Sequence, residues 1–418
     1  MSAKIRIAIV MLSAGVAFYA IAGGFPWDRG ATAKGNQWAQ LRIFDEVLYR
    51  ISKDYVDEPD MERVRTGALR GLADGLDAYS AYLTPAQVAG YVPVEHGVHA
   101  VGGMALSKYG GYVYVVSCWK GSPAERSGIA TGDIIEYIGK APTRDMSLYD
   151  AEMLLTDVSN GPHEVKLFRA GQSLTVTFTN GPVVAPAVEA RMIEPGVGYV
   201  GVTSLSTGKA AEVRAAIDQL SGKGMKRLVF DLRGCATGTL EDGANVANIF
   251  VESGVLGRKI GRGGVEGAAI EAQAALVGFK GPLTVIVDPS SAGAAEVVAS
   301  SVLAAKRGDV VGERTFGAGV ELELFKLRDG GAMLITVAKY APASGKPFIE
   351  EGVAPSVEVK RAVPEIVVPE DQDDEEPATP DERPVVKPAP KPPAAEDVQL
   401  KKALEVLKGV DAAAARAA

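Results

Sequence analysis

The segment from Leu283 to Leu322 constrains the fold more than any other part of the chain. Leu283–Asp288 is an apolar run ending in an acid, which is typical of a strand buried on both faces. A turn of small residues, 289–293, separates it from the alanine-rich stretch 294–305, which predicts a helix. This layout places a turn residue at a helix N-terminus, where backbone N–H groups favour negative charge. Enzymes use the same geometry to hold a nucleophile and its oxyanion.

Strands and helices alternate on the N-terminal side of this segment. Residues 198–203 read as a strand, 209–220 as a helix and 227–231 as a second buried strand. Such alternation predicts βαβ crossovers and a central sheet. We therefore expect an α/β core over residues 185–362.

Two motifs in this core resemble those of the carboxy-terminal processing peptidases, the tail-specific serine proteases. Residues 291–296, Ser-Ala-Gly-Ala-Ala-Glu, are similar to the family's Ser-Ala-Ser-Ala-Ser-Glu, in which the middle Ser is the nucleophile. Residues 316–322, Phe-Gly-Ala-Gly-Val-Glu-Leu, are similar to Phe-Gly-Lys-Gly-x-x-Gln, in which Lys is the general base and Gln helps to position it. The resemblance thus puts Gly293, Ala318 and Leu322 in the three catalytic slots.

None of these three residues can do the family's chemistry. A Ser–Lys hydrolase needs a hydroxyl and a neutral amine that takes its proton, and loss of one such group costs roughly 10⁴–10⁶ in turnover. The family's oxyanion turn, Asp-Leu-Arg-x-Asn-Pro-Gly-Gly, has also changed, because Cys235, Ala236 and Thr237 replace three of its residues and Gly238 remains. The sequence therefore predicts no catalytic residue.

Other groups could in principle stand in for the lost ones. Ser290 and Ser291 lie in the same turn, but Lys306 is at the far end of the expected helix, on the order of 20 Å away. Turn serines usually cap the helix that follows. Cys235 is a candidate thiol without an evident His partner, so we interpret it as a small packed residue.

Residues 98–170 resemble a PDZ domain, chiefly through Gly-Ser-Pro-Ala-Glu at 121–125 and Thr-Gly-Asp-Ile-Ile at 131–135. Such domains bind a peptide C-terminus as an added strand, and loop N–H groups take the carboxylate. The resemblance assigns that loop to Gly103, Met104, Ala105 and Leu106. The alternative is that Met104 and Leu106 are simply core residues of a strand.

The N-terminal part contains an export signal and a helical region. Lys4 and Arg6 precede an apolar run to Ala22, which predicts a signal peptide or membrane anchor over 1–22. Residues 37–95 read as helices, with apolar residues at three- and four-residue steps. Their segment 76–85 is similar to the family's Leu-Asp-Pro-His-Ser-Ser-Tyr-Leu-Thr-Pro, with Ala78 and Tyr79 in place of Pro and His. We expect a packing and dimerisation module here.

The C-terminal part changes composition abruptly. Residues 365–396 are rich in proline and acids without an apolar period, which predicts a disordered linker. Residues 397–410 predict a helix whose apolar stripe docks on the body or on a partner subunit.

Three functional hypotheses follow. The first is an exported, inactive member of the family that binds protein C-termini or unfolded tails, alone, as a homo-oligomer or with an active relative. The second is an active serine endopeptidase that uses Ser290 or Ser291, and the third is an architectural envelope protein without a peptide ligand. The net charge of −8 argues against nucleic acid, and the two distant cysteines indicate neither a disulfide framework nor a metal site. We expect no cofactor, and membrane contact only through the N-terminal segment.

Overall fold

A computed structural model describes residues 37–91, 100–157, 159, 161–349, 351–361 and 396–417. The expected signal segment 1–22 and nearly all of the expected linker 365–396 lie outside these residues. The chain divides into two compact units, one up to Gly67 and one from Ala68 onward, and each is described by itself. No helix among the described residues is long and apolar enough to cross a membrane.

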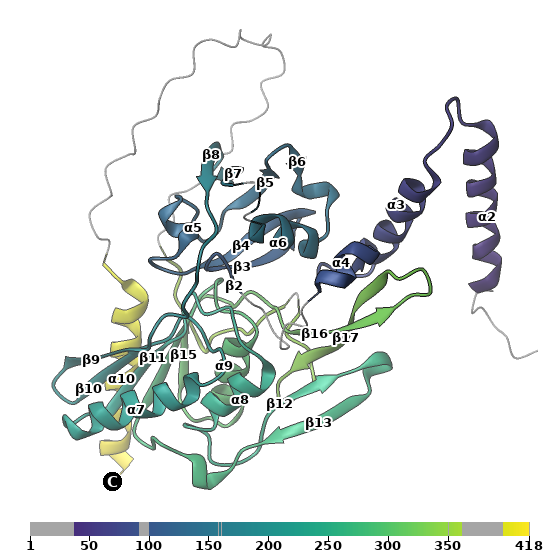
Figure 1. The fold of residues 1–418 in the computed structure, drawn as a ribbon. Coiled ribbons are helices and arrows are strands. Elements are labelled where there is room, and N and C mark those ends of the chain that lie inside the picture. The colour runs from purple at the N-terminus through teal and green to yellow at the C-terminus, as the bar shows by residue number, and fades with distance from the viewer. Residues whose placement is uncertain are drawn as a thin grey trace, which may run out of the picture. The chain divides into compact units, whose positions relative to one another are not determined.

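The core of the second unit is a six-stranded sheet with the order β18-β15-β14-β11-β10-β9 (Figure 1). Its parallel strands are β10 (Val197–Gly201), β11 (Arg227–Asp231), β14 (Leu283–Val287), β15 (Asp309–Gly312) and β18 (Val357–Glu358). At one edge, β9 (Glu189–Glu194) pairs antiparallel with β10. The crossovers from β10 to β11 and from β14 to β15 run through one helix each, Lys209–Gly222 and Ala294–Ala304, as expected for βαβ units. The predicted α/β core is confirmed as a mixed core of sheets and helices.

Helices cover both faces of this sheet. The helices α7 (Lys209–Gly222), α8 (Leu240–Ala247) and α9 (Ala294–Ala304) pack through one large apolar cluster with the strands. The C-terminal helix α10 (Val398–Ala417) contributes Ala403 and Leu407 to a second cluster, with Tyr199, Val229 and Ile286 of the sheet. The predicted apolar stripe of α10 therefore docks on the body of its own chain, and the helix extends beyond the predicted end at residue 410.

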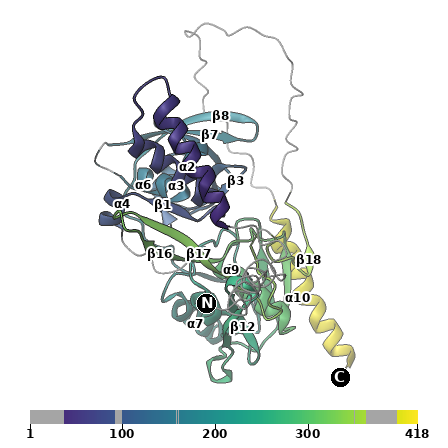
Figure 2. The same cartoon turned by 90° about the vertical axis from the view of Figure 1, so that its right-hand side faces the viewer.

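A second, antiparallel sheet stands beside the first. Its path is β1 (Ala81–Leu83), β17 (Ala332–Ala341), β12 (Val255–Ile260) and β13 (Glu266–Glu271), and β16 (Val320–Lys326) also pairs with β17. The pairing of β1 with β17 brings residues from the N-terminal quarter of the chain next to the C-terminal part of the core (Figure 2). The segment resembling the Leu-Asp-Pro-His-Ser motif is thus built into this sheet.

Residues 100–178 form an inserted sheet domain with its own core. Its antiparallel strands are β2 (Ala100–Val101), β3 (Met104–Tyr109), β4 (Tyr112–Cys118), β5 (Ile134–Ile138), β6 (Ala141–Pro142), β7 (His163–Arg169) and β8 (Gln172–Phe178). The helices α5 (Pro123–Arg126) and α6 (Leu148–Thr156) accompany them. Because β8 pairs with β7 along its whole length, this domain runs past the boundary of 170 that the sequence suggested.

Three helices lie N-terminal to the inserted domain. They are α2 (Gln37–Asp54), α3 (Met61–Asp74) and the short α4 (Pro85–Gly90). Helix α4 begins with a capping box. The side chains of Thr84 and Gln87 each accept a hydrogen bond from the other's backbone amide. The helical reading of residues 37–95 thus corresponds to three helices, with the short strand β1 between α3 and α4.

Candidate functional site

The turn between β14 and α9 ends at Gly293, the N-cap of α9. Its backbone has φ 56° and ψ −108°, a conformation that a residue with a side chain adopts only under strain. Gly293 is buried, yet a Cβ atom added there would meet no atom within 4 Å. The position that the motif resemblance assigns to the nucleophile therefore has the geometry to present a side chain into free space and has no side chain to present.

Glu296 joins this turn to the loop that follows β15. Its carboxylate accepts the backbone N–H of Gly293 at 2.8 Å, that of Gly317 at 2.8 Å and that of Ala318 at 2.9 Å. The hydroxyl of Thr315 donates to the same carboxylate. One buried side chain thus fixes the backbone of two of the three catalytic slots.

The environment of Glu296 has opposite effects on its ionisation. Complete burial raises the pKa of the Glu296 carboxyl to about 7, although the hydrogen bonds that it accepts work in the other direction. Glu296 therefore changes charge near neutral pH, inside the frame of the candidate site.

The turn after β11 supplies the second wall of the site. Gly238 has φ 119°, and a Cβ atom there would lie 2.6 Å from the carbonyl oxygen of Leu205, so only glycine fits. The hydroxyl of Thr237 donates to Ser204 at 2.9 Å. Cys235 is fully buried and its burial raises the pKa of its thiol, which keeps the thiol protonated and supports its interpretation as a packed residue.

The two serines of the turn are poorly placed to act as nucleophiles. The Ser291 hydroxyl is fully buried, donates to the carbonyl oxygen of Leu232 at 2.9 Å and accepts the N–H of Asp288 at 3.0 Å. Ser290 is also buried, and neither serine lines the cleft described next. Lys306 is exposed after the end of α9.

A cleft of about 560 Å³ lies between the core and the inserted sheet domain. On the core side its lining includes Gly238, Gly293, Gly319, Leu322, Leu334 and Tyr340. On the other side it includes Gly102, Leu106, Leu148, Tyr149 and Met153. Glu152 is the one carboxylate among the described lining residues, which include no Lys, Arg or His. The cleft thus joins Gly293 and Leu322 to the inserted domain and offers no amine or imidazole among these residues.

The three slots have different surroundings. Gly293 and Leu322 line the cleft, whereas the Ala318 side chain is buried. Ala318 belongs to an apolar seam that also contains Ala105, Val116, Ala236 and Ala292. At this seam strands β3 and β4 of the inserted domain lie against the turns of the core, and the ring of Tyr114 stacks on that of Phe316 at 5.9 Å.

The residues assigned to peptide binding are also divided by the structure. The side chains of Met104 and Leu106 are both buried in the core of the inserted domain, and Leu106 also borders the cleft. Ala105 packs in the seam, and Gly103 is held against Ser122, which a Cβ atom would approach to 2.2 Å. For Met104 and Leu106 the packing matches the alternative of core residues, and the peptide-binding role of Gly103–Leu106 stays a prediction.

Part of the strand edge expected to take a peptide is already paired. The chain's own β2 runs antiparallel to the start of β3, with Ala100 opposite Ala105 and Val101 opposite Met104. In the described chain, the edge of β3 from Leu106 onward has no strand on that side. A peptide added as a strand would therefore begin beside Leu106 rather than beside Gly103.

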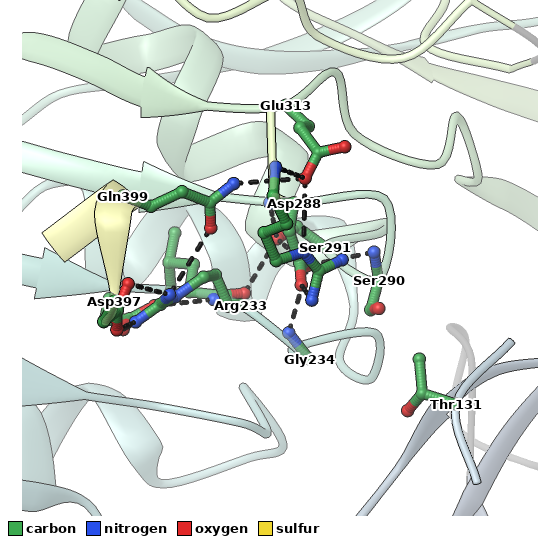
Figure 3. Close-up of polar contacts among 12 residues, drawn as sticks. Thr131, Arg233, Gly234, Asp288, Ser290, Ser291, Glu313, Asp397 and Gln399 are labelled. Carbon is green, nitrogen blue, oxygen red and sulfur yellow. Dashed lines mark hydrogen bonds and ion pairs between the residues drawn. The ribbon is translucent and has the colours of Figure 1, made fainter. Parts of the chain in front are cut away.

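A polar network connects the C-terminal helix with the turns that follow β11, β14 and β15 (Figure 3). The guanidinium of Arg233 donates to Asp231 at 2.6 Å and to Asp397, just before α10, at 2.8 Å. Gln399 on α10 donates to Glu313 at 3.2 Å, and Asp288 accepts the N–H of Gly234 at 3.3 Å. The turns after β11 and β14 are thus linked to each other and to α10.

Sequence reasoning did not assign a role to Glu296 or Arg233. A lone acid three residues into an otherwise apolar, alanine-rich helix was the available signal for Glu296, because the third helical position is where a side chain caps the first turn. Arg233 had no such signal, since Asp397 is distant in sequence. No group of three or more His, Cys, Asp or Glu that could hold a metal occurs within the described ranges.

Comparisons with known proteins agree with this architecture. The sequence pattern of peptidase family S41 matches residues 196–359. The chain is 30% identical over 346 residues to the chloroplastic C-terminal processing peptidase of Tetradesmus obliquus, covering 78% of this chain and 72% of that protein. It is 27% identical over 320 residues to the carboxy-terminal processing protease CtpA of Bacillus subtilis, covering 76% and 68%. The solved structure of a photosystem II D1 C-terminal processing protease superposes with a TM-score of 0.64 at 28% identity, covering 78% of this chain and 87% of that one.

Proposed function

Because the chain belongs to peptidase family S41, the carboxy-terminal processing peptidases, we propose that it is a member that binds polypeptide tails without cleaving them. Its ligands are protein C-termini or unfolded tails, and its role is that of an adaptor or regulator, alone or beside an active relative. The N-terminal segment Met1–Ala22 supports the further proposal that it acts in the periplasm or cell envelope.

The observation that carries the proposal is the content of the cleft. In its lining Gly293 has a backbone conformation that would strain any residue with a side chain, and it offers no hydroxyl. Ala318 is buried in an apolar seam where the family carries an amine. Without nucleophile and base a Ser–Lys mechanism cannot begin, whereas a wide, largely apolar cleft can still bind a chain.

The inserted sheet domain supports the binding part of the proposal. We propose that it works as a PDZ domain whose peptide adds to the edge of β3 from Leu106 onward, beside α6. Strand addition needs only backbone hydrogen bonds together with pockets for alternate side chains. Such binding survives the loss of hydrolysis.

The test compares the natural protein with a variant in which the chemistry is restored. The chain from Gly23 onward and its Gly293→Ser/Ala318→Lys/Leu322→Gln variant are incubated with an unfolded protein that ends in apolar residues. We expect the natural protein to be inert and to bind a labelled apolar tail peptide with saturation in fluorescence anisotropy, and the restored variant to cut.

Two results would contradict the proposal. Cleavage by the natural protein that disappears in Ser291→Ala would favour the active endopeptidase with that serine as nucleophile. Absence of saturable binding to any tail peptide would favour an architectural role. If neither form cuts, the altered turn at Cys235–Thr237 is tested next by restoring Asn, Pro and Gly there.

A further inference from the structure

We infer that the core side of the cleft is a pocket for a large, uncharged apolar side chain of the bound polypeptide. This inference rests on the proposed function and adds the chemistry of the ligand. The pocket, called the vacated pocket below, consists of Gly293, Gly319, Leu322, Leu334 and Tyr340.

Gly293 leaves open space in the vacated pocket, and Gly319 allows close approach to Tyr340. A Cβ atom at Gly293 would meet nothing within 4 Å, so the turn before α9 is open toward the cleft. Gly319 lies against the ring of Tyr340, whose atoms would come within 3.1 Å of an added Cβ. The ring of Tyr340 therefore forms the aromatic floor of the vacated pocket beside Gly319, which has no side chain.

The walls of the vacated pocket are aliphatic. Leu322 packs with Leu334 in the cluster formed by β1, β16 and β17. In the family resemblance the position of Leu322 belongs to a glutamine, so this chain has an apolar wall where a polar side chain is expected. An apolar wall favours an apolar occupant because both surfaces leave water together.

The vacated pocket also lacks a charge that could bind an ion. The carboxylate of Glu321, next to Leu322, pairs with Lys259 at 2.8 Å, and Glu296 is buried behind the turn with its acceptors occupied by backbone amides. Burial raises the pKa of the Tyr340 phenol, which keeps it neutral. An uncharged side chain such as Phe or Leu therefore fits, and a Lys or Asp side chain would lose its hydration without a partner.

The experiment measures the affinity of a set of tail peptides. A host peptide with an apolar C-terminus carries Phe, Leu, Ala or Lys at one position at a time, and each peptide is titrated by fluorescence anisotropy. At one position we expect Phe or Leu to bind on the order of tenfold more tightly than Ala, the size expected for one buried apolar side chain, and Lys to bind more weakly than Ala.

A variant pair locates the effect in the vacated pocket. Leu322→Gln should remove the preference for Phe over Ala, whereas Leu324→Gln should keep it. Leu324 is the matched control because it lies on the same strand, is similarly half-buried in the same apolar cluster, and does not line the cleft.

The outcomes separate the two proposals. Saturable binding with no preferred side chain at any position, or a preference unaffected by Leu322→Gln, would overturn the vacated pocket and leave tail binding intact. Failure of every peptide to bind would overturn both.

Discussion

At the scale of single residues, Glu296 is the clearest remnant of the catalytic frame. Its carboxylate accepts three backbone N–H groups and the Thr315 hydroxyl, so the backbone at Gly293 and Ala318 is held in place although neither residue carries a reacting group. A frame kept in this way still shapes the cleft. The hydrogen bonds to Glu296 also explain why Gly293 and Ala318 keep their backbone conformation although neither can take part in catalysis.

The ionisation of Glu296 predicts a specific pH dependence of stability. Burial raises its pKa from 4.5 to about 7 in the folded chain, so the folded state binds this proton more tightly than the unfolded state does. The stabilisation is complete below about pH 4.5 and is lost as the pH rises through about 7, a change of roughly 3 kcal/mol. We expect Glu296→Gln, which carries no charge, to lose less unfolding free energy between pH 5 and pH 8 in urea denaturation than the natural protein.

The control for removing one negative charge is Glu323→Gln, because Glu323 is exposed on β16. Equal pH dependence of the natural protein and Glu296→Gln would mean that Glu296 does not titrate in this range. Glu296→Gln should also be less stable at low pH by roughly 1–3 kcal/mol, since its amide group must face one of the backbone donors.

Other residues of the site show where sequence reasoning stops. The three slots could be read from motif spacing because the flanking glycines and the strand–turn–helix pattern are local features. The burial of Ala318 could not be predicted from the sequence, because it depends on contacts with Ala105 and Val116, which belong to a domain inserted far upstream. The sequence also could not tell that Leu106, and not Met104, borders the cleft, because both side chains belong to one core and the register of β3 against β4 shifts between Ala105 and Leu106.

At the scale of secondary-structure elements, α10 is the piece that completes the core. The central sheet has parallel strands whose apolar residues point to both faces, so each face needs a cover. The helices α7, α8 and α9 cover one face, and α10 covers the other through Ala403 and Leu407. An ion pair of Asp397, just before α10, with Arg233 in the turn after β11 holds the start of this helix (Figure 3).

We expect Ala403→Asp to destabilise the protein strongly. Ala403 is fully buried, so an aspartate there would place an unpaired charge between α10 and the sheet, at a cost of about 3 kcal/mol or more. Chemical denaturation measures the loss. Gly409→Asp is the control, because Gly409 is exposed on the same helix and an added side chain meets nothing there. Equal stabilities of the two variants would show that α10 does not need this docked face.

At the scale of the second unit as a whole, the sequence predicted the parts better than their assembly. The strands and helices of the core follow from apolar runs and alternation that reach only a few residues along the chain. The closure of the second sheet by β1 depends instead on the pairing of Leu83 with Ala332, which lie far apart in sequence. The extension of the inserted domain through β8 was missed because the strand Gln172–Phe178 is mostly exposed and lacks an apolar run.

The apolar seam around Ala318 holds the inserted domain against the core, and it gives the last prediction. A lysine at residue 318 would add four methylene groups and a charge to a site that is 2% exposed, between Ala105 and Ala292. Overpacking of a filled apolar site typically costs 1–3 kcal/mol, and the structure can relieve it most cheaply by moving the inserted domain away. We therefore expect Ala318→Lys to speed amide hydrogen exchange in peptides covering 104–118, with little change in β14.

The matched control is Glu323→Lys, which introduces the same side chain at an exposed position of β16. Faster exchange in β14 as well would indicate general destabilisation, and unchanged exchange in 104–118 would show that the seam does not hold the domain. The seam also bears on the restored variant of the proposed function, because that variant carries the same lysine. For the restored variant to cleave, the inserted domain must move at this seam to make room for the lysine. The exchange pattern of Ala318→Lys therefore tells whether an inert restored variant fails because the domain does not move or because a catalytic group is still missing.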